Sequence, residues 1–127
     1  MCSILAILDL KSDAAPLRAR ALRLSKLQRH RGPDWSGVYA DDRAILAHER
    51  LAIVDVLHGA QPLLNGAGTH ALAVNGEIYN HRELRKTLTR PYEFKTDSDC
   101  EIILPLYAEH DTGFLDMLSG IFAFVLY

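Results

Sequence analysis

The feature that constrains the fold most is the apolar run at the start of the chain. Cys2 and Ser3 are followed at once by Ile4–Leu8, a stretch without a polar residue. The ends of protein chains are usually mobile and polar unless the fold holds them in place. A short apolar run of this kind is typical of a strand that is buried on both faces. The sequence therefore predicts a rigid first strand that fixes the position of Cys2.

Cys2 itself has two interpretations. If Met1 is removed, as is usual when the next residue is small, Cys2 carries a thiol and a free α-amine. An α-amine has a reference pKa of about 7.7–8.0, so part of it is unprotonated near neutral pH and can act as a general base for the thiol. These first residues leave open whether Cys2 is such a nucleophile or an ordinary buried cysteine.

Composition excludes several classes of protein. Of the 127 residues, 49% are hydrophobic and 24% charged, as in a soluble globular domain with a core of its own. The net charge of -2 favours neither a nucleic-acid partner nor an anionic membrane surface. No apolar run is long enough to span a bilayer, and the start lacks the pattern of a secretory signal. Cys2 and Cys100 make no disulfide framework, so we expect a cytoplasmic protein, and the 6 histidines have no metal-ligand spacing.

The first half of the chain predicts a mixture of helix and strands. Lys11–Asp13 offers an N-cap for a helix whose apolar face is formed by Leu17, Ala21 and Leu24. This helix should end near Arg29–Arg31. We then expect a hairpin that joins Val38–Ala40 to Ala44–His48. A turn at Asn65-Gly66 and a strand over Thr69–Val74 should follow.

The second half predicts short elements. Asn80 and Glu83 resemble a capping box that opens a helix to about Leu88. Ser98 is a good N-cap for a helix from Cys100 to about Glu109, in which Pro105 should cause a kink or an early end. A short strand at Tyr92–Phe94, a short helix over Gly113–Leu118 and a buried strand over Ile121–Tyr127 complete the pattern. Because the sequence stops inside that last strand, we expect the chain to be the front part of a longer domain.

Several polar positions allow both a structural and a functional interpretation. Arg50 lies between apolar runs and needs an anionic partner, which is either a structural carboxylate or the carboxylate of a substrate. Asn75-Gly76 follows a strand and is either a turn, the favoured interpretation, or an amide and a backbone N–H that form an oxyanion hole. Asp99 either stabilises a helix start or binds an ammonium group in a cleft.

Five stretches, taken in order, resemble one known family: Cys2–Ile4, Arg29–Asp34, His48–Asp55, Asn75–Asn80 and Ser98-Asp99. They resemble the glutaminase domain of glutamine-hydrolysing asparagine synthetases, class II glutamine amidotransferases with an N-terminal nucleophile. The resemblance implies an α+β fold, the αββα four-layer sandwich of N-terminal-nucleophile hydrolases, truncated here at its C-terminal end. Residues 1–127 would be part of that domain, and the ATP-binding synthetase domain would lie outside the chain.

The resemblance also implies roles for single residues. Cys2 would be the nucleophile that forms a thioester with glutamine, and Asn75 and Gly76 would form the oxyanion hole. The implied substrate-binding residues are Arg50 for the α-carboxylate, Asp99 for the α-amine with Glu77 beside it, and Ile53 and Val54 through their backbone.

The implied reaction converts glutamine to glutamate and ammonia without a cofactor or metal. The ammonia would pass through an internal tunnel to the synthetase domain, which uses ATP and Mg to convert aspartate to asparagine, in an enzyme expected to be a homodimer. Two alternatives remain open at this point. The chain is either the glutaminase domain of another class II amidotransferase, with a sugar-phosphate or phosphoribosyl acceptor, or a glutamine-binding fragment without activity. No nucleic-acid or membrane partner is expected.

Overall fold

The structure, a computed structural model, describes residues 1–55 and 57–127 and has an α+β architecture. Two antiparallel sheets have three strands each, in the orders β1-β3-β2 and β4-β5-β6, so β3 and β5 are the central strands. The strands are β1 (Ser3–Leu8), β2 (Trp35–Ala40), β3 (Ala44–Arg50), β4 (Leu63–Leu64), β5 (Ala71–Ile78) and β6 (Gly120–Leu126).

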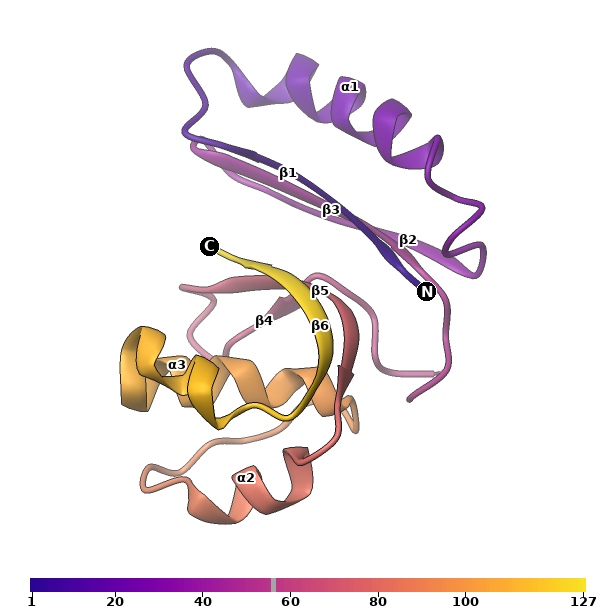
Figure 1. The fold of residues 1–127 in the computed structure, drawn as a ribbon. Helices are drawn as coiled ribbons and strands as arrows, with labels where there is room; N and C mark the ends of the chain where they lie inside the picture. The colour runs from indigo at the N-terminus through magenta and orange to yellow at the C-terminus, as the bar shows by residue number, and fades with distance from the viewer. Residues whose placement is uncertain (56) are drawn as a thin grey trace.

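Helices cover the outward face of each sheet, and the two sheets face each other (Figure 1). α1 (Ala14–Lys26) lies over the first sheet, and α2 (His81–Thr87) and α3 (Ile103–His110) lie on the far side of the second. The 3-10 helices η1 (Asp99–Ile102) and η2 (Asp111–Met117) flank α3. None of the helices in the described parts of the chain combines the length and apolar character needed to cross a bilayer.

β3 is the strand around which the first sheet is built, because all of its 7 residues are buried. Ala44 and Leu46 pack against Ala71 and Ala73 of the second sheet. Since side chains alternate along a strand, the intervening residues of β3 face α1. The small side chains of Ala44, Ala71 and Ala73 let the two sheets approach closely, with a thin apolar layer between them.

The expected hairpin is present, and an aspartate holds its turn. β2 pairs with β3 in a register that places Ala40 opposite Ile45. The Oδ1 atom of Asp41 accepts hydrogen bonds from the backbone N–H groups of Arg43 and Ala44, each at 2.8 Å. This carboxylate replaces the backbone partners that a tight turn lacks.

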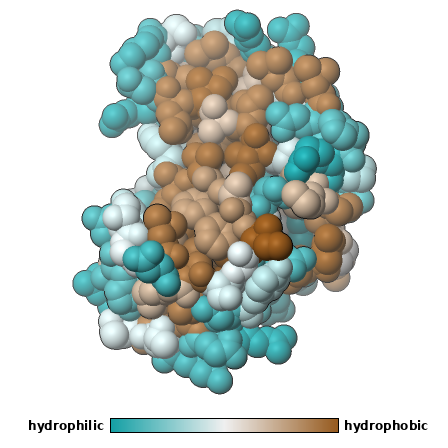
Figure 2. Space-filling view, in the orientation of Figure 1, coloured by the Kyte–Doolittle hydropathy of each residue, from teal (hydrophilic) through white to brown (hydrophobic). Residues whose placement is uncertain are grey.

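The larger core lies between the second sheet and α3. Leu72, Val74 and Ile78 of β5 contribute one face of that strand, and Phe114 packs among them at 2% exposure. Figure 2 shows a band of hydrophobic residues that crosses the middle of one face of the molecule, with hydrophilic residues along its margins. The apolar layers therefore reach the surface on this side.

Two predictions of burial are wrong. In β1, expected to be buried on both faces, Ala6 and Leu8 are exposed, and in β6 the side chain of Ile121 is 70% exposed. Both are edge strands with a neighbour on one side in the part of the chain that is described. The apolar runs identified the strands, but not how much of each strand the fold covers.

Three local predictions also differ from the structure. Residues 92–94 form no strand. The Asn80 side chain closes no capping box, because it donates to the Met117 carbonyl and accepts from the Ser119 N–H. Pro105 breaks no helix, because α3 begins at Ile103 and its first turn tolerates proline. In α1, Ala21 faces the core as expected, whereas Leu24 is 41% exposed.

The layer between the sheets should dominate the stability of the first sheet. Leu46 is fully buried there, so Leu46→Ala should lower the free energy of unfolding by about 2–5 kcal/mol, because it removes apolar contacts and leaves a cavity. Leu27→Ala is the matched control: Leu27 is 74% exposed, and the change should cost less than about 0.5 kcal/mol. Chemical denaturation of both variants measures the difference, and equal effects would contradict the assigned packing.

Candidate active site

A pocket of about 410 Å³ lies where β1 begins and where β3 and β5 approach their C-terminal ends. Its lining comes from segments far apart in sequence. All eight residues singled out from the sequence are among the lining residues: Cys2, Arg50, Ile53, Val54, Asn75, Gly76, Glu77 and Asp99. The fold thus brings the predicted site residues together.

Cys2 is half-buried, and the segment after β3 fixes its side chain. The N–H of Leu51 donates to the Cys2 Sγ atom at 3.3 Å, and Arg31 Nε donates to the Cys2 carbonyl oxygen at 3.1 Å. An N–H that points at the sulfur stabilises negative charge on it. The preceding residue, Met1, is 66% exposed.

Gly76 lies inside β5, so the expected turn at Asn75-Gly76 is wrong. The strand continues to Ile78, and β6 runs beside it with Phe122 opposite Gly76. A Cβ atom at position 76 would collide with the Ile121 carbonyl oxygen and with the backbone of Phe122, and φ is +156°. The glycine is therefore required by the close approach of β6.

The backbone N–H of Gly76 points into the pocket. In a strand, the N–H groups of alternate residues point to the same edge. On the edge away from β6, the Val74 N–H donates to Oε1 of Gln61 and the Ile78 N–H donates to Oδ2 of Asp99, each at 2.6 Å. Gly76 lies between these two residues, and β4 pairs with β5 only at Ala71 and Leu72. The Gly76 N–H therefore faces the pocket rather than another strand.

Along β5, the side chains of Asn75 and Glu77 point to the same face as that of Ala73, which lies in the layer between the sheets. This places both polar side chains at the end of that layer, where the pocket opens. Asn75 is half-buried and Glu77 is exposed. An amide side chain and the Gly76 N–H thus meet at one pocket, as an oxyanion hole requires.

Arg50 is 6% exposed, and two backbone carbonyls are among its partners. Its Nη2 atom donates to the carbonyl oxygens of Val54 at 2.9 Å and of Asp55 at 2.5 Å. From the sequence, only anionic partners were expected, because burial of a charge calls for compensation. The guanidinium closes the loop after β3 into one wall of the pocket, beside Ile53 and Val54.

Asp99 begins η1 and joins it to the end of β5. Its side chain is buried, and its Oδ2 atom accepts from the Ile78 N–H. Ser98 caps the helix as expected, because its Oγ atom accepts from the Cys100 N–H at 3.3 Å. Cys100 is buried as predicted, and burial, with the Asp99 charge, raises the pKa of its thiol. The Asp99 carboxylate is therefore held at the pocket by fixed backbone.

Sequence reasoning missed two supporting residues next to Arg50. His48 is fully buried, and its Nε2 atom lies 2.8 Å from the Val74 carbonyl oxygen, which joins the two sheets. Glu49 accepts from Ser25 Oγ of α1 at 2.7 Å and from Ser36 Oγ of β2 at 2.5 Å. Three polar residues in succession at the end of a buried strand were the available signal. In residues 1–55 and 57–127, no group of three His, Cys, Asp or Glu side chains is placed to hold a metal ion.

Comparison with known proteins gives a consistent result. Residues 1–127 match the family described as a glutamine amidotransferase domain. The chain is 64% identical over 127 residues to asparagine synthetase B (glutamine-hydrolyzing) of Escherichia coli K12, covering 100% of this chain and 23% of that protein. It is 57% identical over 129 residues to a probable asparagine synthetase (glutamine-hydrolyzing) of Dictyostelium discoideum, covering 100% of this chain and 23% of that protein. It is 54% identical over 126 residues to asparagine synthetase (glutamine-hydrolyzing) 1 of Arabidopsis thaliana, covering 99% of this chain and 21% of that protein. The chain thus spans less than a quarter of these curated relatives.

His48 should make the stability of the domain depend on pH. Burial lowers the pKa of its ring from 6.5, as does the Arg50 charge, although the bond to the Val74 carbonyl acts in the opposite direction. As the pH falls through 6.5, the unfolded chain therefore takes up a proton at His48 before the folded chain does, and the free energy of unfolding decreases.

The variant His48→Gln keeps an N–H for the Val74 carbonyl and should lose less stability between about pH 8 and about pH 5.5 than the unchanged protein. Urea denaturation at the two pH values measures this difference. His81, whose pKa is also lowered by burial, is present in both proteins and cancels in the comparison. Equal losses in the two proteins would contradict a buried neutral His48.

Proposed function

The chain belongs to the glutamine amidotransferase domain family, and on that premise we propose that it hydrolyses glutamine to glutamate and ammonia. One observation carries this proposal: a single pocket is lined by Cys2, by Asn75 and Gly76, and by Arg50 and Asp99. The pocket thus offers a nucleophile, donors for an oxyanion, and one charge of each sign for an amino acid. The domain is proposed to have the αββα sandwich of N-terminal-nucleophile hydrolases, which the order of helix and sheet layers supports.

The proposed reaction begins after removal of Met1. The free α-amine of Cys2 takes the thiol proton, and the sulfur attacks the carbonyl carbon of the glutamine side-chain amide. The C–N bond then breaks, the nitrogen leaves with the transferred proton as ammonia, and a γ-glutamyl thioester remains. Water attacks this thioester, and glutamate and the Cys2 thiol are released.

Asn75 and Gly76 act on the tetrahedral intermediates. The side-chain amide of Asn75 and the backbone N–H of Gly76 donate to the oxygen that becomes negative when sulfur or water adds. Loss of one such donor typically reduces the rate by ~10²–10³. Because Gly76 donates through its backbone, the strand geometry of β5 sets the position of this donor.

The charged residues bind the amino-acid end of glutamine. Arg50 binds the α-carboxylate and Asp99 the α-amine, with Glu77 beside it and with the backbone of Ile53 and Val54 along the substrate. A guanidinium and a carboxylate at separate positions in one pocket fix both the position and the direction of an amino acid. No cofactor is assigned to this step.

The fate of the ammonia is proposed from the relatives, which are named glutamine-hydrolyzing asparagine synthetases. We place this chain in a longer cytoplasmic protein, a homodimer, whose synthetase domain uses ATP and Mg to convert aspartate to asparagine. The ammonia reaches that domain through an internal tunnel.

Replacement of the nucleophile tests the function directly. In the protein with its whole natural chain, Cys2→Ser should remove glutamine hydrolysis, because a hydroxyl is a far weaker nucleophile than a thiol at neutral pH. Formation of glutamate measures the loss. Asparagine synthesis from an added ammonium salt is the control and should persist, because it bypasses Cys2. Retained glutamine hydrolysis in the variant would contradict the assignment of Cys2.

A further inference from the structure

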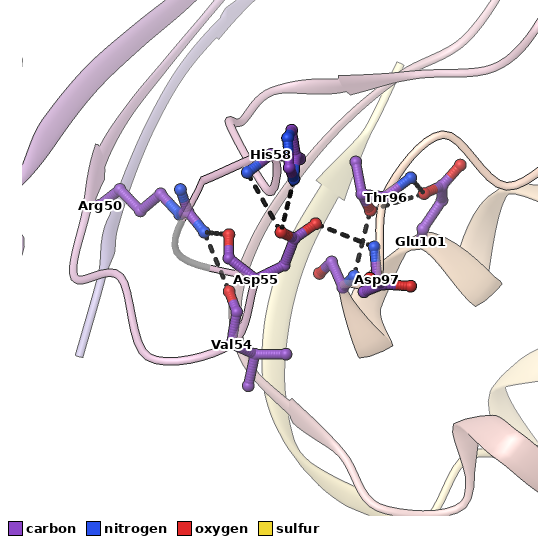
Figure 3. A network of polar contacts seen from close by, with 8 residues as sticks. Arg50, Val54, Asp55, His58, Thr96, Asp97 and Glu101 are labelled. Carbon is purple, nitrogen blue, oxygen red and sulfur yellow. Dashed lines mark hydrogen bonds and ion pairs between the residues drawn. The ribbon is translucent and has the colours of Figure 1, made fainter.

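Asp55 lies at the centre of a hydrogen-bond network that holds the loop after β3 (Figure 3). Its carbonyl oxygen accepts from Nη2 of Arg50 and from the N–H of Gly59, the latter at 3.0 Å. A Cβ atom on Gly59 would come within 2.6 Å of the same guanidinium nitrogen, so the loop packs directly on Arg50. The pocket wall that contains Val54 is therefore closed against Arg50.

The carboxylate of Asp55 reaches a second segment. Oδ1 accepts from the His58 N–H at 3.1 Å and lies 3.4 Å from His58 Nδ1, and Oδ2 accepts from the Asp97 N–H at 2.9 Å. The Asp55 side chain is 6% exposed. Burial opposes its charge, but the N–H groups of Asp97 and His58 hold the pKa of the carboxyl below its ordinary value. The backbone of Asp55 is left-handed at φ 48°, a conformation that aspartate adopts more readily than most residues.

The segment that Asp55 contacts is firmly held. Glu101 accepts from the N–H groups of Lys95 and Thr96 at 2.9 and 2.8 Å, and from Thr96 Oγ1 at 2.6 Å. Two residues after Asp97, Asp99 is bonded to the end of β5. Asp55 therefore connects a loop that packs on Arg50 to a rigid support that carries Asp99, although 42 residues separate Asp55 from Asp97.

We propose that Asp55 is a positioning residue for glutamine, an inference that rests on the proposed function. Its carboxylate sets the spacing between the two walls of the pocket, one with Arg50 for the α-carboxylate and one with Asp99 for the α-amine. Asp55 is not among the residues that line the pocket, so it acts through the two walls. The N–H groups of His58 and Asp97 each donate to a different oxygen of the Asp55 carboxylate. An asparagine amide at this position has only one oxygen that can accept.

Asp55→Asn is the test, in the protein with its whole natural chain. Its NH2 group must face either the Asp97 N–H or the His58 N–H, so the loop should shift away from Asp99. We expect the KM for glutamine to rise about 10- to 100-fold, the loss expected for one hydrogen bond to a charged group, and kcat to change less than about threefold.

Glutaramate separates positioning from a general loss of structure, because it keeps the amide and one carboxylate but lacks the α-amine. Since it uses Arg50 and not Asp99, its inhibition constant should change less than about threefold in Asp55→Asn. Asp41→Asn is the matched control. Asp41 also holds two backbone N–H groups, in the β2–β3 turn outside the pocket, and its loss should leave the KM unchanged.

An unchanged KM for glutamine in Asp55→Asn, with turnover intact, would overturn this inference alone. An equal loss of affinity for glutamine and glutaramate would also overturn it, since that result means a disordered pocket. No glutamine turnover in the unchanged protein would instead contradict the proposed function, and the inference would fall with it.

Discussion

The buried end of β3 is the constraint on which the site depends. His48, Glu49 and Arg50 are polar residues in a strand whose 7 residues are all buried, so each requires a partner inside the protein. His48 bonds to the second sheet, Glu49 to α1 and β2, and Arg50 to the loop that follows. These bonds fix four neighbouring elements relative to one strand, and the second sheet and the loop after β3 both contribute to the pocket with Cys2.

The sequence indicates what lies in the site better than how the site is held. Local patterns were enough for the β2–β3 hairpin, for the Asp13 and Ser98 caps, and for the existence of α1, which ends at Lys26 and not near Arg29–Arg31 as expected. The residues that line the pocket were singled out by the resemblance of five short stretches to one family. The physical arguments alone favoured a turn at Asn75-Gly76, because they could not foresee that β6 would extend the ladder past Gly76.

The remaining differences have a common physical cause. Periodicity reports which residues avoid water, but it does not report which strand has a neighbour on each side. Ile121 in β6 is therefore exposed despite its apolar surroundings in the sequence. The Asp55 carboxylate accepts from the Asp97 N–H, which is 42 residues distant, and no local pattern reveals such a bond. Long-range hydrogen bonds to the backbone could therefore not be predicted from the sequence.

The proposed mechanism requires Cys2 to become an N-terminal nucleophile inside a formed glutamine pocket. Intact-mass analysis after incubation with a reactive glutamine analogue that alkylates the nucleophile examines both requirements at once. We expect a protein without Met1 that carries one adduct on Cys2, and protection of Cys2 by excess glutamine. Retention of Met1, or an unlabelled Cys2 that a general thiol reagent still modifies, would contradict it.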